Sequence, residues 1–222
     1  MTEHSFRDMR RAMVASQLRT TGVSDPRVVA AMGSVPRETF VPEQRLPLAY
    51  ADALVPLKPG RDLNTPMSLG RLLTEAHPAP GDRALVVGAA TGYAAAVLAR
   101  LVAHVVALEE DEELSARAES ALAALPAGER GSIDLVRGPL AKGCGKSGPY
   151  DLILIDGAVE QVPQALIDQL VDGGRLATGL IEDGVSRLCL GRKAGDGFGL
   201  IAFADAASAM IPGFEKPRAF NF

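Results

Sequence analysis

Tryptophan is absent from this chain, and aromatic residues make up only 5% of it. Lysine and arginine form no cluster, and the formal net charge is −4. Surfaces that bind nucleic acids depend on basic patches and on aromatic rings that stack with bases. The composition therefore predicts no nucleic-acid partner.

Residues that commonly bind metals are also few. The chain has three scattered histidines and two distant cysteines, Cys144 and Cys189, which we expect to be free thiols in a reducing compartment. No metal site is predicted. No apolar run approaches the roughly 20 residues that span a bilayer, and the first residues lack the apolar core of a secretion signal. We expect a cytoplasmic protein that makes no membrane contact.

A regular alternation of strand and helix patterns fills the middle of the chain. The first strand is apolar throughout and rich in valine, which is typical of a strand buried on both faces. Strands are expected over 84–87, 105–108, 133–136, 151–155 and 175–180, and helices over 92–101, 112–125 and 164–170. Repeated strand–helix units predict an α/β fold with a mostly parallel sheet covered on both faces.

The two ends of the chain differ from this middle part. Apolar spacing predicts an amphipathic helix over 6–18, and Asp25-Pro26 and Thr65-Pro66 each predict a helix start. Between these starts, extended loop is favoured by several prolines: Pro36, Pro42, Pro47, Pro56 and Pro59. A Gly/Asp turn between 186–191 and 199–204 predicts a terminal antiparallel hairpin.

These patterns predict a division into three parts. Residues 1–79 form a helical and loop segment that closes over the site, and residues 80–207 form the α/β core. Residues 208–222 form an apolar tail, for which packing on the domain is favoured over binding a partner.

Three strand ends carry candidate site residues, because ligands of open α/β sheets bind beyond the carboxyl ends of the strands. They are the glycine turn Gly88–Gly92, the acidic run Glu109–Asp111 and Asp156. An acid about twenty residues after such a turn accepts hydrogen bonds from ribose hydroxyls. Each feature also has a purely structural interpretation: tight packing for the glycines, a helix start for the acidic run, and a turn cap for Asp156.

A nicotinamide-binding unit shares the pairing of a glycine turn with an acid. The order Gly-Ala-Ala-Thr-Gly does not fit Gly-x-Gly-x-x-Gly, however, and about 80 residues precede the first strand. Both facts argue against a dinucleotide fold, which usually begins with that strand.

Several segments resemble one known family. The Val-Pro-Arg-Glu-Thr-Phe-Val-Pro segment at 35–42 is the most specific, and further matches lie at 13–18, 25–28, 49–52, 92–99, 162–163, 169–170 and 173–176. On these residues the chain resembles the protein-L-isoaspartate O-methyltransferases, a branch of the S-adenosylmethionine-dependent class I methyltransferases, from about Met13 to about Ala204.

The resemblance implies a Rossmann-like class I methyltransferase fold with a mostly parallel sheet, a C-terminal antiparallel hairpin and an N-terminal helical extension. It also implies methyl transfer from S-adenosylmethionine to the carboxylate of isoaspartyl residues in damaged proteins, with S-adenosylhomocysteine as the product. The enzyme would mainly position a carboxylate that is already nucleophilic. The partner implied is therefore an isoaspartyl peptide or protein, and the oligomeric state stays open.

The cofactor residues that the resemblance implies depart from the family pattern. They are Gly88, Ala89, Ala90, Gly92, Glu109, Glu110 and Asp156. The family turn is Glu-Ile-Gly-Thr-Gly-Ser-Gly-Tyr. In this chain Val86 replaces the acid and Ala90 replaces the middle glycine. Ala90 adds a methyl group where the family's backbone approaches the cofactor. The later Gly-Asp-Gly becomes Gly138-Pro139-Leu140, so the family's carboxylate is missing there.

The implied catalytic positions, Asn64 and Asp62, differ as well. The family's Gly-x-Thr-Ile-Ser-x-Pro aligns with residues 60–66, so its serine falls on Asn64 and its threonine on Asp62. Asn64 can still donate a hydrogen bond to a carboxylate, whereas an ionised Asp62 repels one.

Asp156-Gly157-Ala158 replaces the family's Thr-Ala-Ala and adds negative charge near an anionic substrate. Three hypotheses stay open: an isoaspartyl methyltransferase with weakened cofactor affinity, a family member serving as a binding or regulatory module, and a methyltransferase with another substrate.

Overall fold

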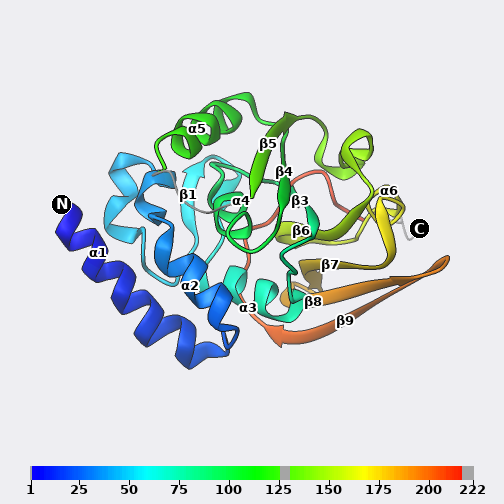
Figure 1. Ribbon diagram of the computed structural model, residues 1–222, viewed down its shortest axis with the longest axis horizontal. Coiled ribbons are helices and arrows are strands. Elements are labelled where there is room, and N and C mark those ends of the chain that lie inside the picture. The colour runs from blue at the N-terminus through cyan, green and yellow to red at the C-terminus, as the bar shows by residue number, and fades with distance from the viewer. Residues whose placement is uncertain (1, 126–130, 217–222) are drawn as a thin grey trace, which may run out of the picture.

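The computed structural model describes residues 2–125 and 131–216, which build one sheet of seven strands in the order β5-β4-β3-β6-β7-β8-β9 (Figure 1). Strands β3 to β7 are parallel, and β8 and β9 run antiparallel at one edge. The strands are β3 (Arg83–Val87), β4 (His104–Glu109), β5 (Ser132–Arg137), β6 (Tyr150–Val159), β7 (Leu170–Glu182), β8 (Val185–Ala194) and β9 (Gly197–Asp205). The predicted fold class and the terminal hairpin are confirmed.

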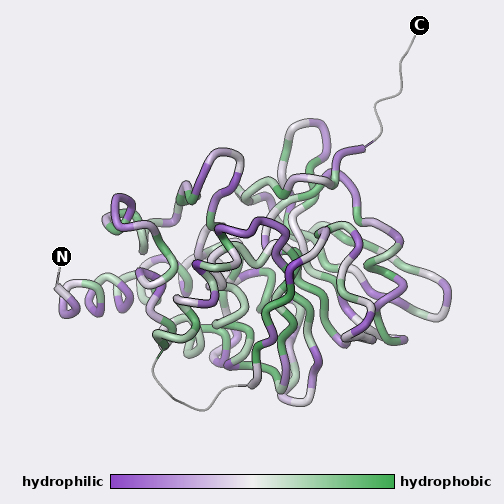
Figure 2. The backbone as a smooth tube through the Cα atoms, turned by 90° about the horizontal axis from the view of Figure 1, so that it is seen from above, coloured by the Kyte–Doolittle hydropathy of each residue, from purple (hydrophilic) through white to green (hydrophobic). Residues whose placement is uncertain are grey.

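Alternating side chains of β3 divide the core into two layers, because successive side chains of a strand point to opposite faces. Ala84 and Val86 pack on the face with α3 (Pro66–Ala76), α4 (Tyr93–Leu98) and α5 (Glu112–Ala123). Leu85 and Val87 pack on the other face, which α6 (Gln164–Ile167) and the tail cover. Figure 2 shows the apolar strands running through the middle of the molecule.

Helices of the N-terminal segment extend the first layer. Helix α1 (Glu3–Ala12) continues through a π-helical turn, η1 (Met13–Leu18), and a 3₁₀ turn, η2 (Arg19–Thr21), before α2 (Pro26–Ser34). The helix starts are as predicted: Asp25 and Thr65 cap α2 and α3 by accepting hydrogen bonds from backbone amides.

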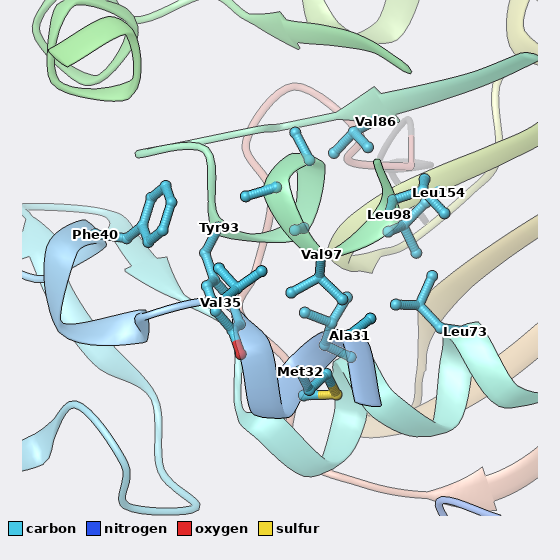
Figure 3. Packing of buried hydrophobic residues seen from close by; sticks show 14 of the residues in the cluster. Ala31, Met32, Val35, Phe40, Leu73, Val86, Tyr93, Val97, Leu98 and Leu154 are labelled. Atoms are coloured by element: carbon cyan, nitrogen blue, oxygen red, sulfur yellow. The ribbon is translucent and has the colours of Figure 1, made fainter. Parts of the chain in front are cut away.

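The N-terminal segment packs directly against α4. Figure 3 shows Ala31, Met32 and Val35 beside Val97 of α4 and near Leu73 of α3. The rings of Phe40 and Tyr93 meet edge to face with their centroids 5.6 Å apart.

The proline-rich stretch 36–66 is more structured than the sequence predicts. It holds two 3₁₀ helices, η3 (Arg37–Phe40) and η4 (Glu43–Leu48), and an antiparallel hairpin of β1 (Val55–Lys58) and β2 (Arg61–Leu63). Pro56 fits in β1 because both strands of a two-stranded sheet are edges. Gly60 has a φ of +75° at the hairpin turn, a value that glycine adopts without strain.

Other boundaries shift by a few residues. The helix expected over 164–170 ends at Ile167, since Leu170 already belongs to β7. Packing of the tail on the domain is confirmed for Ile211 and Phe214, which are buried, whereas Phe220 and Phe222 lie outside the described residues. Cys144 and Cys189 are free, and among the described residues no helix has the length and apolarity to cross a membrane.

Candidate functional site

The carboxyl ends of β3, β4 and β6 meet at the centre of the sheet. From β3 the chain builds outward through β4 and β5 on one side, then returns to place β6 on the other side. Such a reversal of strand order is where open α/β sheets bind ligands. Gly88 follows β3 and Glu109 ends β4, and both lie near Asp156 at this point. Asp156 was expected to follow a strand ending at Ile155, but it lies inside β6, because pairing with β7 continues to Val159.

The turn after β3 uses three left-handed residues. Gly88, Ala90 and Gly92 have φ values of +74°, +50° and +95°. Alanine in this conformation costs about 1 kcal/mol or more, because its Cβ approaches the following carbonyl oxygen. The turn aims the Ala90 amide at Glu109, and that amide donates to Oε2 at 2.7 Å.

The carboxylate of Glu109 is completely buried and accepts five hydrogen bonds. Besides the Ala90 amide, the amides of Glu110 and Asp111 donate to Oε1, each at 3.0 Å. The guanidinium of Arg61 donates to both oxygens, with Nη1 to Oε1 and Nη2 to Oε2 each at 2.6 Å. Two carboxylate oxygens offer about four lone-pair sites, so the acid is saturated.

Arg61 lies at the start of β2, and its hairpin is fastened at a second point. Burial alone lowers the pKa of Arg61, but the hydrogen bonds and charge of Glu109 raise it above its ordinary value, so the guanidinium stays charged. The ammonium of Lys58 contacts Asp111 at 2.6 Å and Glu113 at 3.3 Å at the start of α5. Both strands of the hairpin are thus held to the end of β4 and the helix that follows it.

Asp156 and Asn64 form a second buried pair. Asn64 Nδ2 donates to Asp156 Oδ1 at 3.3 Å, and Asn64 Oδ1 accepts from the amides of Thr65 and Ala209. Burial raises the pKa of Asp156 to about 6, although the hydrogen bond from Asn64 and the charge of Arg37 act in the opposite direction. The predicted catalytic Asn64 and the predicted cofactor residue Asp156 are therefore in direct contact.

The tail crosses the same strand ends. Two backbone hydrogen bonds join Ala158 of β6 to the tail. The Ala158 amide donates to the carbonyl of Ala209, and the Ala158 carbonyl accepts from the amide of Ile211. A Cβ placed on Gly157 would lie 2.3 Å from the carbonyl oxygen of Ala209, and one on Gly88 would lie 3.1 Å from Cδ1 of Ile211. These glycines leave room for the tail itself.

Two of the predicted site residues point elsewhere. Asp62 is half-buried, and it alternates along β2 with the buried Arg61 and Leu63, so its side chain lies on the opposite face of the hairpin. The side chain of Glu110 is exposed, and this residue contributes its backbone amide to Glu109. Their proposed roles in catalysis and cofactor binding receive no support from this geometry.

Two arginines that sequence reasoning did not select organise the site. Arg61 is the first, and it occupies the unspecified position after the glycine in the Gly-x-Thr-Ile-Ser-x-Pro pattern. Arg37 is the second: it is fully buried, donates to the carbonyls of Ala49 and Asn64, and lies 4.6 Å from the Tyr93 ring centroid. Arg37 belongs to the most family-specific segment, which was the one available indication of its importance.

The raised pKa of Asp156 predicts a pH dependence of stability. Because the folded-state pKa of about 6 exceeds the ordinary value of 3.8, the folded protein holds this proton more tightly. Stability from this group is present below about pH 4 and is lost as the pH rises toward 6. Asparagine at this position stays neutral at both pH values. The difference in the free energy of unfolding between Asp156→Asn and the wild type should therefore be about 1–3 kcal/mol more favourable to the variant at pH 7.5 than at pH 4.

Urea unfolding of the wild type and the variant at both pH values measures this difference. Asp196→Asn, in the exposed turn of the β8–β9 hairpin, is the matched control and should show no such change. Equal pH dependence in the wild type and Asp156→Asn would contradict the assignment.

Comparison with known proteins identifies the relatives of this chain. A family model described as protein-L-isoaspartate(D-aspartate) O-methyltransferase matches residues 9–207. A protein-L-isoaspartate O-methyltransferase of Methanoregula boonei is 40% identical over 175 residues, which cover 79% of each chain. Protein-L-isoaspartate O-methyltransferase 1 of Rhodopseudomonas palustris is 39% identical over 172 residues, covering 78% of this chain and 69% of the relative.

Solved structures share the fold at lower identity. A protein-L-isoaspartate O-methyltransferase structure has a TM-score of 0.78 at 23% identity, and the match covers 92% of this chain and 66% of that one. A structure from Plasmodium falciparum is described as a putative protein-L-isoaspartate O-methyltransferase in complex with S-adenosyl-L-homocysteine. It has a TM-score of 0.75 at 18% identity, and the match covers 92% of this chain and 97% of that one.

The strand order, the glycine turn and the acid at the end of β4 define a Rossmann-like methyltransferase fold. Within that class, the family match and the identity of about 40% determine the branch. This chain belongs to the protein-L-isoaspartate(D-aspartate) O-methyltransferase family.

Proposed function

We propose that this protein is an S-adenosylmethionine-dependent methyltransferase that esterifies the carboxylate of isoaspartyl residues in proteins. The observation that carries the proposal is the family match over residues 9–207. The meeting of the glycine turn with Glu109 at the reversal of strand order supports it. S-adenosylmethionine supplies an activated methyl group, and the substrate carboxylate supplies the nucleophile.

In the closed conformation of the site, the residues do not fit this cofactor. Glu109, the acid expected to bind the ribose, has no acceptor capacity left beside its five donors. Ala209 and Ile211 cover Gly157 and Gly88 at the strand ends. Binding therefore requires the site to open.

Asn64 is the residue best placed to orient a substrate carboxylate. Its amide nitrogen now donates to Asp156, so a substrate oxygen would take over this hydrogen bond. Because burial raises the pKa of Asp156 to about 6, its neutral form is accessible in mild acid, and that form does not repel an anionic substrate. The isoaspartyl partner and the cytoplasmic location remain predictions from the sequence.

A second candidate function, a binding or regulatory module without methyl transfer, is favoured by the Arg61–Glu109 pair. A peptide with one isoaspartyl residue and the same peptide with aspartate in its place separate the candidates. With S-adenosylmethionine, we expect a methyl ester, detected by mass spectrometry, on the isoaspartyl peptide alone. Absence of ester from a folded protein at saturating peptide would support the binding module, and an ester on other acceptors would indicate a different substrate.

A further inference from the structure

Arg61 competes with any ligand for Glu109, the acid at the end of β4. A planar guanidinium that donates to both oxygens of a carboxylate makes a strong and directional pair. Here the side chain of Arg61 is only 6% exposed and that of Glu109 is not exposed at all, so water does not weaken the contact. The two N–H groups occupy one lone pair on each carboxylate oxygen, and these lone pairs are no longer available to another donor.

The segment that carries Arg61 is fixed on both sides of this residue. Lys58, at the other side of the hairpin turn, binds Asp111 and Glu113. The carbonyl of Asn64, just after β2, accepts a hydrogen bond of 2.6 Å from the buried Arg37. Arg61 is therefore presented to Glu109 by a pre-organised hairpin, and little conformational freedom is lost when the pair forms.

The turn between Lys58 and Arg61 is exposed. A Cβ placed on Gly60 would meet no heavy atom within 4 Å, so the tip of the hairpin is open to solvent. Lys58 is 28% exposed, and its contact with Glu113, which is 53% exposed, is of the kind that contributes little to stability. Withdrawal of the whole hairpin would expose Val55, Leu57 and Leu63, which are buried in the core. The smaller change that frees Glu109 is a rotation of the Arg61 side chain, which breaks its two hydrogen bonds to Glu109.

We propose that Arg61, carried by the β1–β2 hairpin, is an internal latch that takes the place of the cofactor's ribose hydroxyls on Glu109. S-adenosylmethionine then binds only to molecules in which the Arg61 side chain has left Glu109. The proposal rests on the proposed function, since it assumes that Glu109 is the ribose-binding acid. If only a small fraction of the molecules is open, the apparent affinity equals the affinity of the open state multiplied by that fraction.

The latch predicts that removing Arg61 tightens cofactor binding. Isothermal titration with S-adenosylhomocysteine, on the full chain, should show Arg61→Ala binding about 10–100-fold more tightly than the wild type, because the open state then needs no pair to be broken. Arg175→Ala is the matched control, since it removes a partly buried arginine paired with Asp82 at the opposite end of the sheet. Its affinity should equal that of the wild type.

Each other outcome overturns the latch in a distinguishable way. Equal, measurable affinity of the wild type and Arg61→Ala, or tightening by Arg175→Ala as well, would reject the latch and leave the proposed function standing. Weaker binding by Arg61→Ala would make Arg61 a cofactor ligand. No binding by either protein at about 1 mM would reject the latch and the proposed function together.

Circular dichroism and thermal melting establish that each variant is folded. If Arg61→Ala does not fold, Arg61→Gln keeps a side chain that donates to Glu109 without the charge. It should tighten binding in the same direction, and failure to do so rejects the latch.

Discussion

Glu109→Ala should lower the free energy of unfolding by about 3–5 kcal/mol, the cost of leaving a buried ionic partner uncompensated. The substitution strands the Arg61 guanidinium in a buried position and removes the acceptor for the amides of Ala90, Glu110 and Asp111. Urea unfolding followed by circular dichroism measures the loss. This acid is thus expected to stabilise the fold as well as to mark the candidate site.

The neighbouring Glu110→Ala is the matched control, because that side chain is exposed, and its effect should stay within about 0.5 kcal/mol. The double variant Arg61→Ala, Glu109→Ala provides a sharper check. It removes the stranded charge, so it should be more stable than Glu109→Ala alone. A double variant that is less stable by the sum of both single effects would show that the pair is not coupled.

Arg37→Met should also destabilise the protein, by about 2–5 kcal/mol. Methionine keeps much of the volume but leaves the carbonyls of Ala49 and Asn64 without their donor, at about 1–3 kcal/mol for each buried group. Burial lowers the pKa of Arg37, against the opposing influence of Tyr93 and Asp156. The loss of its two donated hydrogen bonds, rather than loss of a surface charge, is therefore the expected cause.

Thermal or urea unfolding measures this effect against Arg45→Met, an exposed arginine in the next 3₁₀ helix, which should change stability by less than about 0.5 kcal/mol. If Arg37→Met proved as stable as Arg45→Met, Arg37 would not be the residue that fixes the loop carrying Asn64.

The core of the fold was predictable because its pattern is local. Residues 84–93 hold a buried strand, left-handed glycines and a helix start within ten positions, and β4 and α5 repeat the strand–helix order. The acidic run Glu109–Asp111 followed from its spacing after the turn, and the family resemblance singled out Glu109. The hairpin β1–β2 was missed because Pro56 in its first strand and Pro59 in its turn resemble loop sequence.

The contacts that close the site were not predictable, because they join residues far apart in the chain. Arg61 and Glu109 are separated by 48 positions, and Ala209 and Asn64 by 145. No periodicity links such pairs, and a single arginine in a loop is usually a solvated residue. The departures at Ala90 and Asp156 did appear in the sequence, and both lie where the closed site needs them.

The ratio of two dissociation constants for S-adenosylhomocysteine, wild type over Arg61→Ala, tests the central claim most directly. It compares occupancy of the same acid with and without its internal partner, and it does not depend on finding the right methyl acceptor. The account predicts a ratio of at least about 10. A ratio of one or less, with both proteins folded, would contradict it.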